Sequence, residues 1–231
     1  MNPTSLDEST ARSEICRVGR SLFDRGYVHA TAGNISVRLA DGFLITPTDA
    51  CLGFLDPDRL ARLDADGRQV AGDRASKTIG LHRRIYAATA ASGRPAGSVI
   101  HTHSTSLVAC SLKAFEASAT FEEDADLLPP ITPYFVMKVG RVPHIAYGRP
   151  GADETAEAVA QAIARHASQG RPLRAVMLAR LGPNVWHDTP AAAMAVLEEL
   201  EETARLWLLA QPTPLDDAQI AELRDVFGAS W

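Results

Sequence analysis

Two histidines, His101 and His103, are the residues whose spacing most directly suggests chemistry. They follow Ser98, Val99 and Ile100, which are expected to form a buried strand, and residues two apart on a strand project to the same side of a sheet. Both imidazoles would converge near the strand's end, and imidazole is a common ligand for zinc, iron and copper. The pattern predicts a transition-metal site; the alternative is a pair of histidines making ordinary hydrogen bonds.

Composition narrows the class of protein before any further motif is considered. The chain has 231 residues, of which 46% are hydrophobic and 22% charged, as in a globular protein. Its net charge of -5 and the lack of a Lys/Arg cluster argue against a nucleic-acid partner. No apolar run approaches the roughly 20 residues of a membrane span, and the polar segment 1–13 does not resemble a secretory signal. Three widely spaced cysteines suit free thiols, so a cytoplasmic location is expected.

Periodicity and turn signals predict the elements that would position the histidines. Helices are expected at residues 5–27, 76–89, 106–115, 152–168, 189–209 and 216–227. Strands are expected at 35–39, 43–46, from 98 onward, at 142–147 and at 174–178, with a second hairpin over 62–70 and a loop over 116–130. Early hairpins followed by helix–strand alternation predict one α/β domain, residues 1–231, with a mixed sheet.

Several segments resemble, in order, the class II aldolase/adducin family and its fuculose-phosphate aldolase group. They are residues 31–36, 44–48, 76–86, 99–103 and 178–183. Other segments are similar to the 3-oxo-tetronate 4-phosphate decarboxylase branch: residues 26–27, 76–77, 132–137, 147–151 and 198–204. The resemblance extends over residues 6–209. It implies a three-layer α/β/α domain around a mostly antiparallel sheet, assembled as a homotetramer with active sites at subunit interfaces.

The resemblance also implies roles for individual residues. His101 and His103 would be two of three histidines that bind a divalent metal, zinc first, with manganese, cobalt or iron as alternatives. A small anionic substrate would be held by backbone N–H groups and side chains, which resemblance assigns to Thr31, Gly33, Asn34, Thr48 and Ser76. Tyr134 would donate a proton, Lys77 could reach a substrate carboxylate or phosphate, and Arg149 could bind an anion through two hydrogen bonds.

Three positions depart from the family pattern, and each concerns chemistry. The third metal histidine is replaced by Leu181, which has no donor atom. The acid/base carboxylate, four residues before His82, is replaced by Thr78, which cannot shuttle a proton near neutral pH. The glycine of the phosphate-binding turn is Asp49, whose charge would repel a phosphate.

A replacement ligand could restore the metal site. His144 lies in an otherwise apolar strand, and the alternative is a core histidine with its own hydrogen bonds. His29, Asp49 or Glu122 are further candidates, and a carboxylate would complete the 2-His-1-carboxylate set of non-haem iron enzymes. His82 is expected to be structural, Arg180 could bind an anion or neutralise an acid, and the pair 186–187 is expected in an exposed hairpin or interface.

The leading hypothesis is a metal-dependent lyase that decarboxylates or cleaves a small oxo or hydroxy acid. A metal ion would stabilise the enolate that remains after CO2 departs. Decarboxylation abstracts no proton, so the loss of the carboxylate at Thr78 should impair a decarboxylase less than an aldolase. Asp49 weakens phosphate binding and makes an unphosphorylated substrate plausible. The alternatives are a repurposed enzyme, either an iron oxygenase or a metal-free biosynthetic enzyme, and a non-catalytic adducin-like module.

Overall fold

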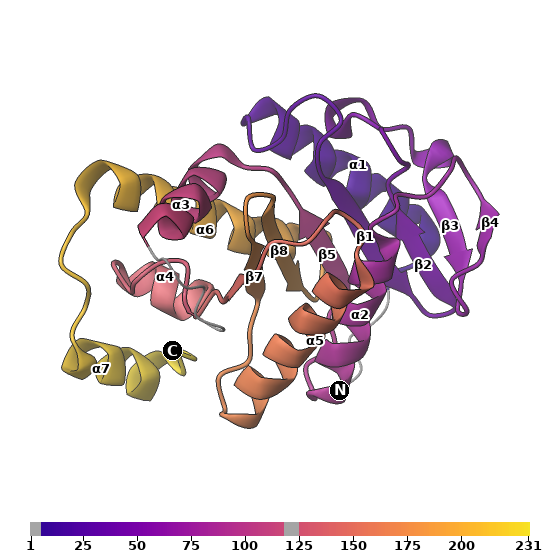
Figure 1. Ribbon diagram of the computed structural model, residues 1–231. Helices are drawn as coiled ribbons and strands as arrows, with labels where there is room; N and C mark the ends of the chain where they lie inside the picture. Colours follow the sequence, from indigo (N-terminus) through magenta and orange to yellow (C-terminus); the bar gives the residue numbers. More distant parts are fainter. Residues whose placement is uncertain (1–5, 118–124) are drawn as a thin grey trace.

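A mostly antiparallel sheet forms the centre of the protein. The computed structural model describes residues 6–117 and 125–231, and within them the sheet has the order β4-β3-β2-β1-β5-β8-β7-β6 (Figure 1). All neighbouring strands are antiparallel except β6 and β7. The strands are β1 Asn34–Leu39, β2 Gly42–Ile45, β3 Ala61–Asp64, β4 Gln69–Ala71, β5 Ser98–His101, β6 His144–Ile145, β7 Ala175–Leu178 and β8 Gly182–His187.

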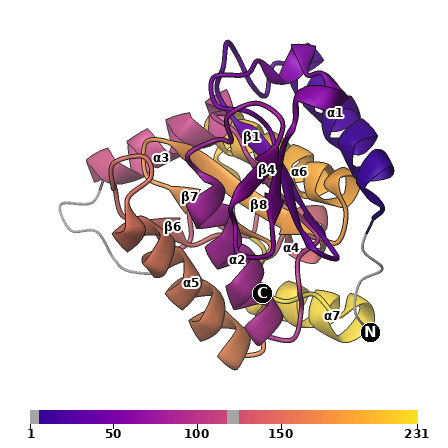
Figure 2. The same cartoon turned by 90° about the vertical axis from the view of Figure 1, so that its right-hand side faces the viewer.

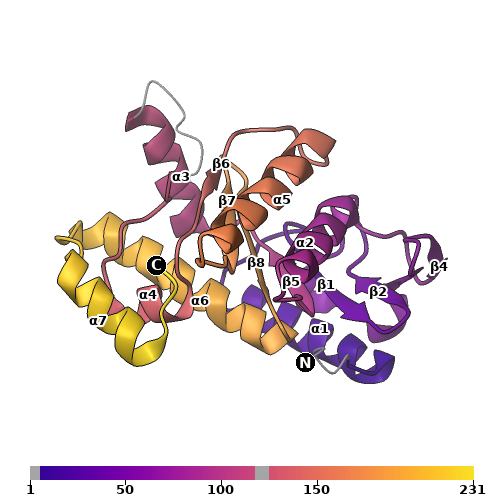
Figure 3. The ribbon, with the colours of Figure 1, turned by 90° about the horizontal axis from the view of Figure 1, so that it is seen from below.

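Helices cover both faces of the sheet. Helices α1 (Glu8–Asp24) and α6 (Pro190–Ala210) lie on one face, and α2 (Ile79–Ala91) and α5 (Asp153–Ser168) lie on the other (Figures 2 and 3). Helices α3 (Thr105–Ala117) and α4 (Pro133–Lys138) pack on α6, and α7 (Asp217–Phe227) packs on α4. Two short 3-10 helices, η1 Leu52–Phe54 and η2 Pro57–Arg59, follow β2. The predicted three-layer α/β/α arrangement with a mixed sheet is confirmed.

Alternation along β5 assigns its side chains to the two layers. Ile100 belongs to the core formed with α1 and α6, whereas Val99 packs with Ile85 and Tyr86 of α2. His101 lies two residues beyond Val99 and therefore faces the α2 layer. Ile100 and Val99 thus anchor the strand on its two faces, and the alternation places His101 on the α2 side.

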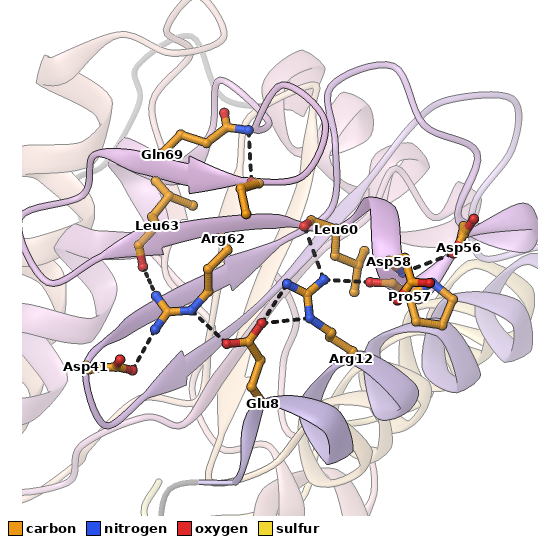
Figure 4. A network of polar contacts seen from close by, with 11 residues as sticks. Glu8, Arg12, Asp41, Asp56, Pro57, Asp58, Leu60, Arg62, Leu63 and Gln69 are labelled. Atoms are coloured by element: carbon orange, nitrogen blue, oxygen red, sulfur yellow. Dashed lines mark hydrogen bonds and ion pairs between the residues drawn. The ribbon is translucent and has the colours of Figure 1, made fainter.

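Ion pairs join α1 to β3 (Figure 4). Glu8 accepts hydrogen bonds from Arg12 at 2.6 Å and from Arg62 at 3.0 Å, and Arg62 also donates to Asp41 at 2.6 Å. The Arg62 side chain is only 10% exposed, so its charge depends on these two carboxylates.

Some elements differ from the sequence-based predictions. Strand β8 and helix α4 were not predicted. Trp186 was expected in an exposed hairpin or an interface. It lies in the β7–β8 hairpin, but the predicted exposure is wrong, because Trp186 is 3% exposed and donates its Nε1–H to the Leu173 carbonyl at 3.0 Å. Predicted strand 142–147 is reduced to two residues, and predicted loop 116–130 lies partly outside the described residues. Among the described helices, none has the length and apolarity needed to span a bilayer.

Candidate active site

Four loops meet at one end of the sheet. This end holds the start of β1, the residues after β2, the end of β5 and the start of β8. The Thr46 N–H donates to the Ile35 carbonyl at 3.0 Å, and the Ser76 N–H donates to the Thr46 carbonyl at 3.2 Å. The Thr48 N–H donates to the Arg74 carbonyl at 2.8 Å. The segments that contain Asn34, Thr48 and Ser76 are therefore held side by side, although they are distant in sequence.

The loop before β1 lies directly against β5. Asn34 is paired with His101 across the two strands. Gly33 has a φ of 87°. Thr31 precedes it and is exposed. The predicted binding loop and the predicted metal ligands thus share one site.

The two histidines converge as their spacing predicts. Their ring centroids are 5.0 Å apart. His101 Nδ1 lies 2.8 Å from the Pro183 carbonyl oxygen, so Nδ1 is the protonated nitrogen and Nε2 keeps its lone pair. Burial, with a smaller effect of His103, lowers the pKa of His101 to about 4. Burial and nearby His29 lower the pKa of His103 as well, so both rings are neutral at pH 7 and able to accept or ligate.

Among the described residues, no third metal ligand joins this pair. Leu181 lines the same cavity as His101, and its side chain packs against the apolar cluster of the α2/α5 layer. Within residues 6–117 and 125–231, no group of three or more His, Cys, Asp or Glu side chains could hold a metal ion. Catalytic metal sites normally have three protein ligands. The donor set of two imidazoles therefore does not fit a resident catalytic ion.

The candidate replacements that the structure describes do not change this result. His144 is paired with Met177, which belongs to the opposite core, and its Nε2 lies 2.8 Å from the Ser111 Oγ of α3. The structure therefore puts His144 on the other face of the sheet from His101. His29 is exposed, and Glu122 lies outside the described residues.

A cavity of about 780 Å³ opens beside His101. Its wall includes Lys77 and Thr78 just before α2, Arg149 just before α5, and Leu181. The charged residues lining it are mostly basic: Arg38, Lys77, Arg83, Arg84 and Arg149, with Asp153 as the acid. Because the whole chain carries a net charge of -5, this local excess of positive charge favours an anionic ligand.

The remaining predicted residues divide between two places. Ser76 Oγ lies 2.9 Å from Thr78 Oγ1, next to the main cavity. Thr48 and Asp49 line a neighbouring hollow of about 280 Å³. Asp49 has a φ of 57°, a conformation that glycine adopts more readily. Tyr134 lies on α4, is 56% exposed and lines neither hollow, so the fold of one chain does not bring it to His101.

A chain of hydrogen-bonded buried side chains, on the same side of the sheet as His101, was not predicted from the sequence. His82 Nδ1 lies 2.7 Å from Ser36 Oγ, which lies 2.7 Å from the Tyr86 hydroxyl. Burial lowers the pKa of His82 to about 3. Asn184, directly opposite His101 on β8, is fully buried. The sequence signal that could have pointed to Asn184 is a polar residue directly before the apolar pair 185–186.

Comparison with known proteins yields one consistent family. Residues 13–208 match the family described as Class II Aldolase and Adducin N-terminal domain. A 3-oxo-tetronate 4-phosphate decarboxylase from Cupriavidus necator is 50% identical over 97% of this chain and 99% of that protein. The protein of the same name from Escherichia coli K12 is 38% identical over 94% of this chain and 96% of its own. The crystal structure of YgbL from Escherichia coli superposes with a TM-score of 0.79 at 37% identity. The superposition covers 94% of this chain and 99% of YgbL. The resemblance inferred from the motifs is confirmed.

Proposed function

The chain belongs to the class II aldolase and adducin family, and we propose that it is a decarboxylating lyase acting on a phosphorylated four-carbon 3-oxo acid. The observation that carries this proposal is the 50% identity, over 97% of the chain, to a protein named 3-oxo-tetronate 4-phosphate decarboxylase. The family acts on small phosphorylated substrates, and the basic cavity beside His101 supports an anionic one.

The chemistry of a 3-oxo acid suits the residues of this cavity. The bond between the carboxylate carbon and C2 breaks, its electron pair forms the C2–C3 double bond, and the carbonyl oxygen at C3 becomes an enolate oxygen. CO2 leaves, and C2 then receives a proton. No base is needed to start this reaction, so Thr78 in place of a carboxylate is compatible with it. Cleavage of an aldol, which needs such a proton transfer, is less well supported.

The positive side chains of the cavity would carry the electrostatic part of the reaction. Lys77 and Arg149 both line the wall beside His101. Cations placed where negative charge develops lower the barrier, because the enolate oxygen gains charge as CO2 departs. His101, neutral and held by the Pro183 carbonyl, would orient a substrate hydroxyl by accepting its hydrogen bond at the free Nε2.

The substrate phosphate would be held by the loops at the end of the sheet. We assign this role to Thr31, Gly33, Asn34, Thr48 and Ser76. Support comes from the backbone hydrogen bonds that hold the segments around residues 35, 46 and 76 side by side. Asp49 opposes phosphate binding at this place, so the affinity for the phosphate is expected to be weak for this family.

The class II aldolase family generally depends on a divalent metal. Because this chain offers two imidazoles, no step is assigned to an ion here. The zinc, or else manganese, cobalt or iron, expected at His101 and His103 stays a prediction. Metal analysis of the purified protein tests it. About one ion per chain, lost in His101→Ala, would support a metal site, and metal-free protein with full activity would contradict it.

We further propose that residues 1–231 form one domain and that the chain is a cytoplasmic homotetramer. Tyr134 would then serve as proton donor to the site of a neighbouring subunit. Its 56% exposure on α4, away from the cavity of its own chain, supports this assignment. The unpaired Cys16, Cys51 and Cys110 support the location. Mass measurement in solution tests the assembly.

The direct test is CO2 release from 3-oxo-tetronate 4-phosphate and from its unphosphorylated counterpart by purified protein. We expect release that Lys77→Met and Arg149→Met reduce. Oxygen consumption with Fe(II) and no CO2 release would favour the oxygenase alternative. No turnover of any kind, with the fold intact, would favour a non-catalytic adducin-like module.

A further inference from the structure

A fully buried carboxamide, which has no hydrogen-bond partner in the described part of the chain, lies next to His101. Asn184, on β8, has 0% exposure, and within the described residues neither its Oδ1 nor its Nδ2 is hydrogen-bonded. Two more buried polar atoms in this region share that condition: Asn34 Oδ1 and His82 Nε2. Buried polar groups are nearly always paired, so three such side chains in one place call for an explanation.

The register of the sheet brings these groups together. Asn34 on β1, His101 on β5 and Asn184 on β8 form one row across three adjacent strands. Residues directly opposite each other project to the same face, with Cβ atoms about 4.5–5.5 Å apart. The two carboxamides therefore flank the His101 ring. His82 comes from α2, which covers this face, and it is close enough to His101 for that residue to lower its pKa.

The unpaired atoms are chemically complementary. Ser36 Oγ can accept from the Tyr86 hydroxyl and donate to His82 Nδ1, at 2.7 Å in both cases. A neutral imidazole that accepts at Nδ1 carries its proton on Nε2. The set then contains two donors, His82 Nε2 and Asn184 Nδ2, and two acceptors, the Oδ1 atoms of Asn184 and Asn34.

Stability alone does not account for Asn184. Its neighbours on the same face are the buried Val176, across on β7, and Trp186, on the same strand. A buried polar group without a partner is destabilising. The carboxamide therefore has a use that packing does not supply.

We propose that Asn184 is a positioning residue of the active site, which accepts from His82 Nε2–H and donates toward Asn34 Oδ1, in both cases through bound water, because the His101 strand lies between the two carboxamides. This arrangement turns the Asn34 Nδ2 toward the bound ligand. The inference rests on the proposed function, in which Asn34 contacts the anionic substrate. It extends the site by a residue that neither family motif nor charge identifies.

Asn184→Leu tests the proposal, because leucine has nearly the same size and no hydrogen-bonding atoms. We expect kcat/KM to fall roughly 10- to 100-fold through misplacement of Asn34. We expect Tm to fall by a few degrees, because the variant leaves His82 Nε2–H and Asn34 Oδ1 buried without their partner. If Asn184 acts through Asn34, the double variant with Asn34→Leu will be no worse than Asn34→Leu alone.

The matched control is Trp186→Phe, on the same strand and face. It removes the 3.0 Å hydrogen bond to the Leu173 carbonyl and should lower Tm without changing kcat/KM. An Asn184→Leu variant that behaves in this same way would overturn the proposal. If Asn184→Leu does not fold, Asn184→Asp keeps the shape and the Oδ1 acceptor but removes the donor. It should then show the loss of kcat/KM, and unaltered kinetics in that variant would overturn the proposal.

A second readout separates this inference from the proposed function. In protein labelled with 15N-histidine, the His82 Nε2–H signal should shift or exchange faster in Asn184→Leu. If wild type releases no CO2 but this signal responds, the polar chain stands and only the assigned reaction fails. If the signal is unaffected, Asn184 is not linked to His82 and the inference is wrong.

Discussion

A Cβ atom on Gly33 would lie 2.9 Å from the carbonyl oxygen of His101. The loop before β1 therefore rests on the strand that carries the histidine pair, with no room for a side chain between them. The φ of 87° at Gly33 adds a second requirement, because residues with a side chain rarely adopt it. The position of the loop before β1 relative to His101 thus depends on one glycine.

Gly33→Ala should lower the free energy of unfolding by about 2–3 kcal/mol and reduce activity, because the new methyl group adds a clash to a strained backbone. Gly93→Ala is the matched control. Gly93 has a φ of 76° but open space around its Cβ position, so it should lose only about 1 kcal/mol and keep activity. Urea unfolding measures both. Equal losses would show that the contact with His101 is unimportant.

Leu181→His should create a three-imidazole metal site. The turn already holds Arg180 at a φ of 63°, and residue 181 lines the cavity next to His101. A third ligand should raise the zinc content and make Tm rise with zinc concentration. Leu181→Gln controls for added polarity. Equal metal content in wild type and Leu181→His would contradict the view that Leu181 limits metal binding.

Asp49→Asn and Asp49→Gly should lower KM for the phosphorylated substrate about fivefold, since removal of one like charge near the phosphate is worth about 1 kcal/mol. Glycine should also relieve the backbone strain at φ 57° and raise Tm slightly more than asparagine does. KM for the unphosphorylated substrate is the control and should not change. A fall in KM for both substrates would exclude a specific effect on the phosphate.

Lys77→Met should reduce kcat/KM at least about tenfold, because it removes a cation from the wall of the cavity. Lys113→Met, on the exposed surface of α3, tests for a general effect of lost charge. Steady-state kinetics at two salt concentrations would distinguish them. Similar, small effects of both variants would place Lys77 outside the reaction.

Glu8→Gln should destabilise the protein by about 1 kcal/mol at pH 7, a loss that solvent screening limits because Glu8 is 43% exposed. The hydrogen bond from Arg12 is the main reason that the pKa of Glu8 is lowered; Arg62 adds to it. A carboxyl group whose pKa is lower in the folded protein stabilises the fold at any pH above its pKa in the unfolded chain. This stabilisation is lost as the pH falls through its pKa in the folded protein. The difference from wild type should therefore vanish in acid.

Glu14→Gln is the control for this network. Glu14 also pairs with an arginine, Arg17 at 2.7 Å, but that arginine is 55% exposed and joins no second element. Its removal should cost less than about 0.5 kcal/mol. Thermal unfolding between pH 3 and pH 7 compares the two variants, and equal effects would mean that the link from α1 to β3 adds no stability.

Much of the fold was predictable because its signals are local. The strand at 98–100, the Asp41-Gly42 turn and the capped helices are each specified by neighbouring residues. Strand β8 was missed because Gly182, Pro183 and Asn184 interrupt its apolar pattern, and it becomes a strand through pairing with β5 and β7. Helix α4 is too short for a periodic signal; its start depends on the Thr132 cap.

The sequence by itself determined the family, the layered α/β architecture and the convergence of His101 and His103, since spacing along one strand decides which side chains share a face. It also determined that Leu181 cannot bind a metal. Tertiary structure alone decided that His144 faces the opposite core, that Tyr134 lies away from the cavity, and that Asn34 and Asn184 flank His101. These relations depend on strand register and layer assignment, which are set by pairing between segments far apart in the chain.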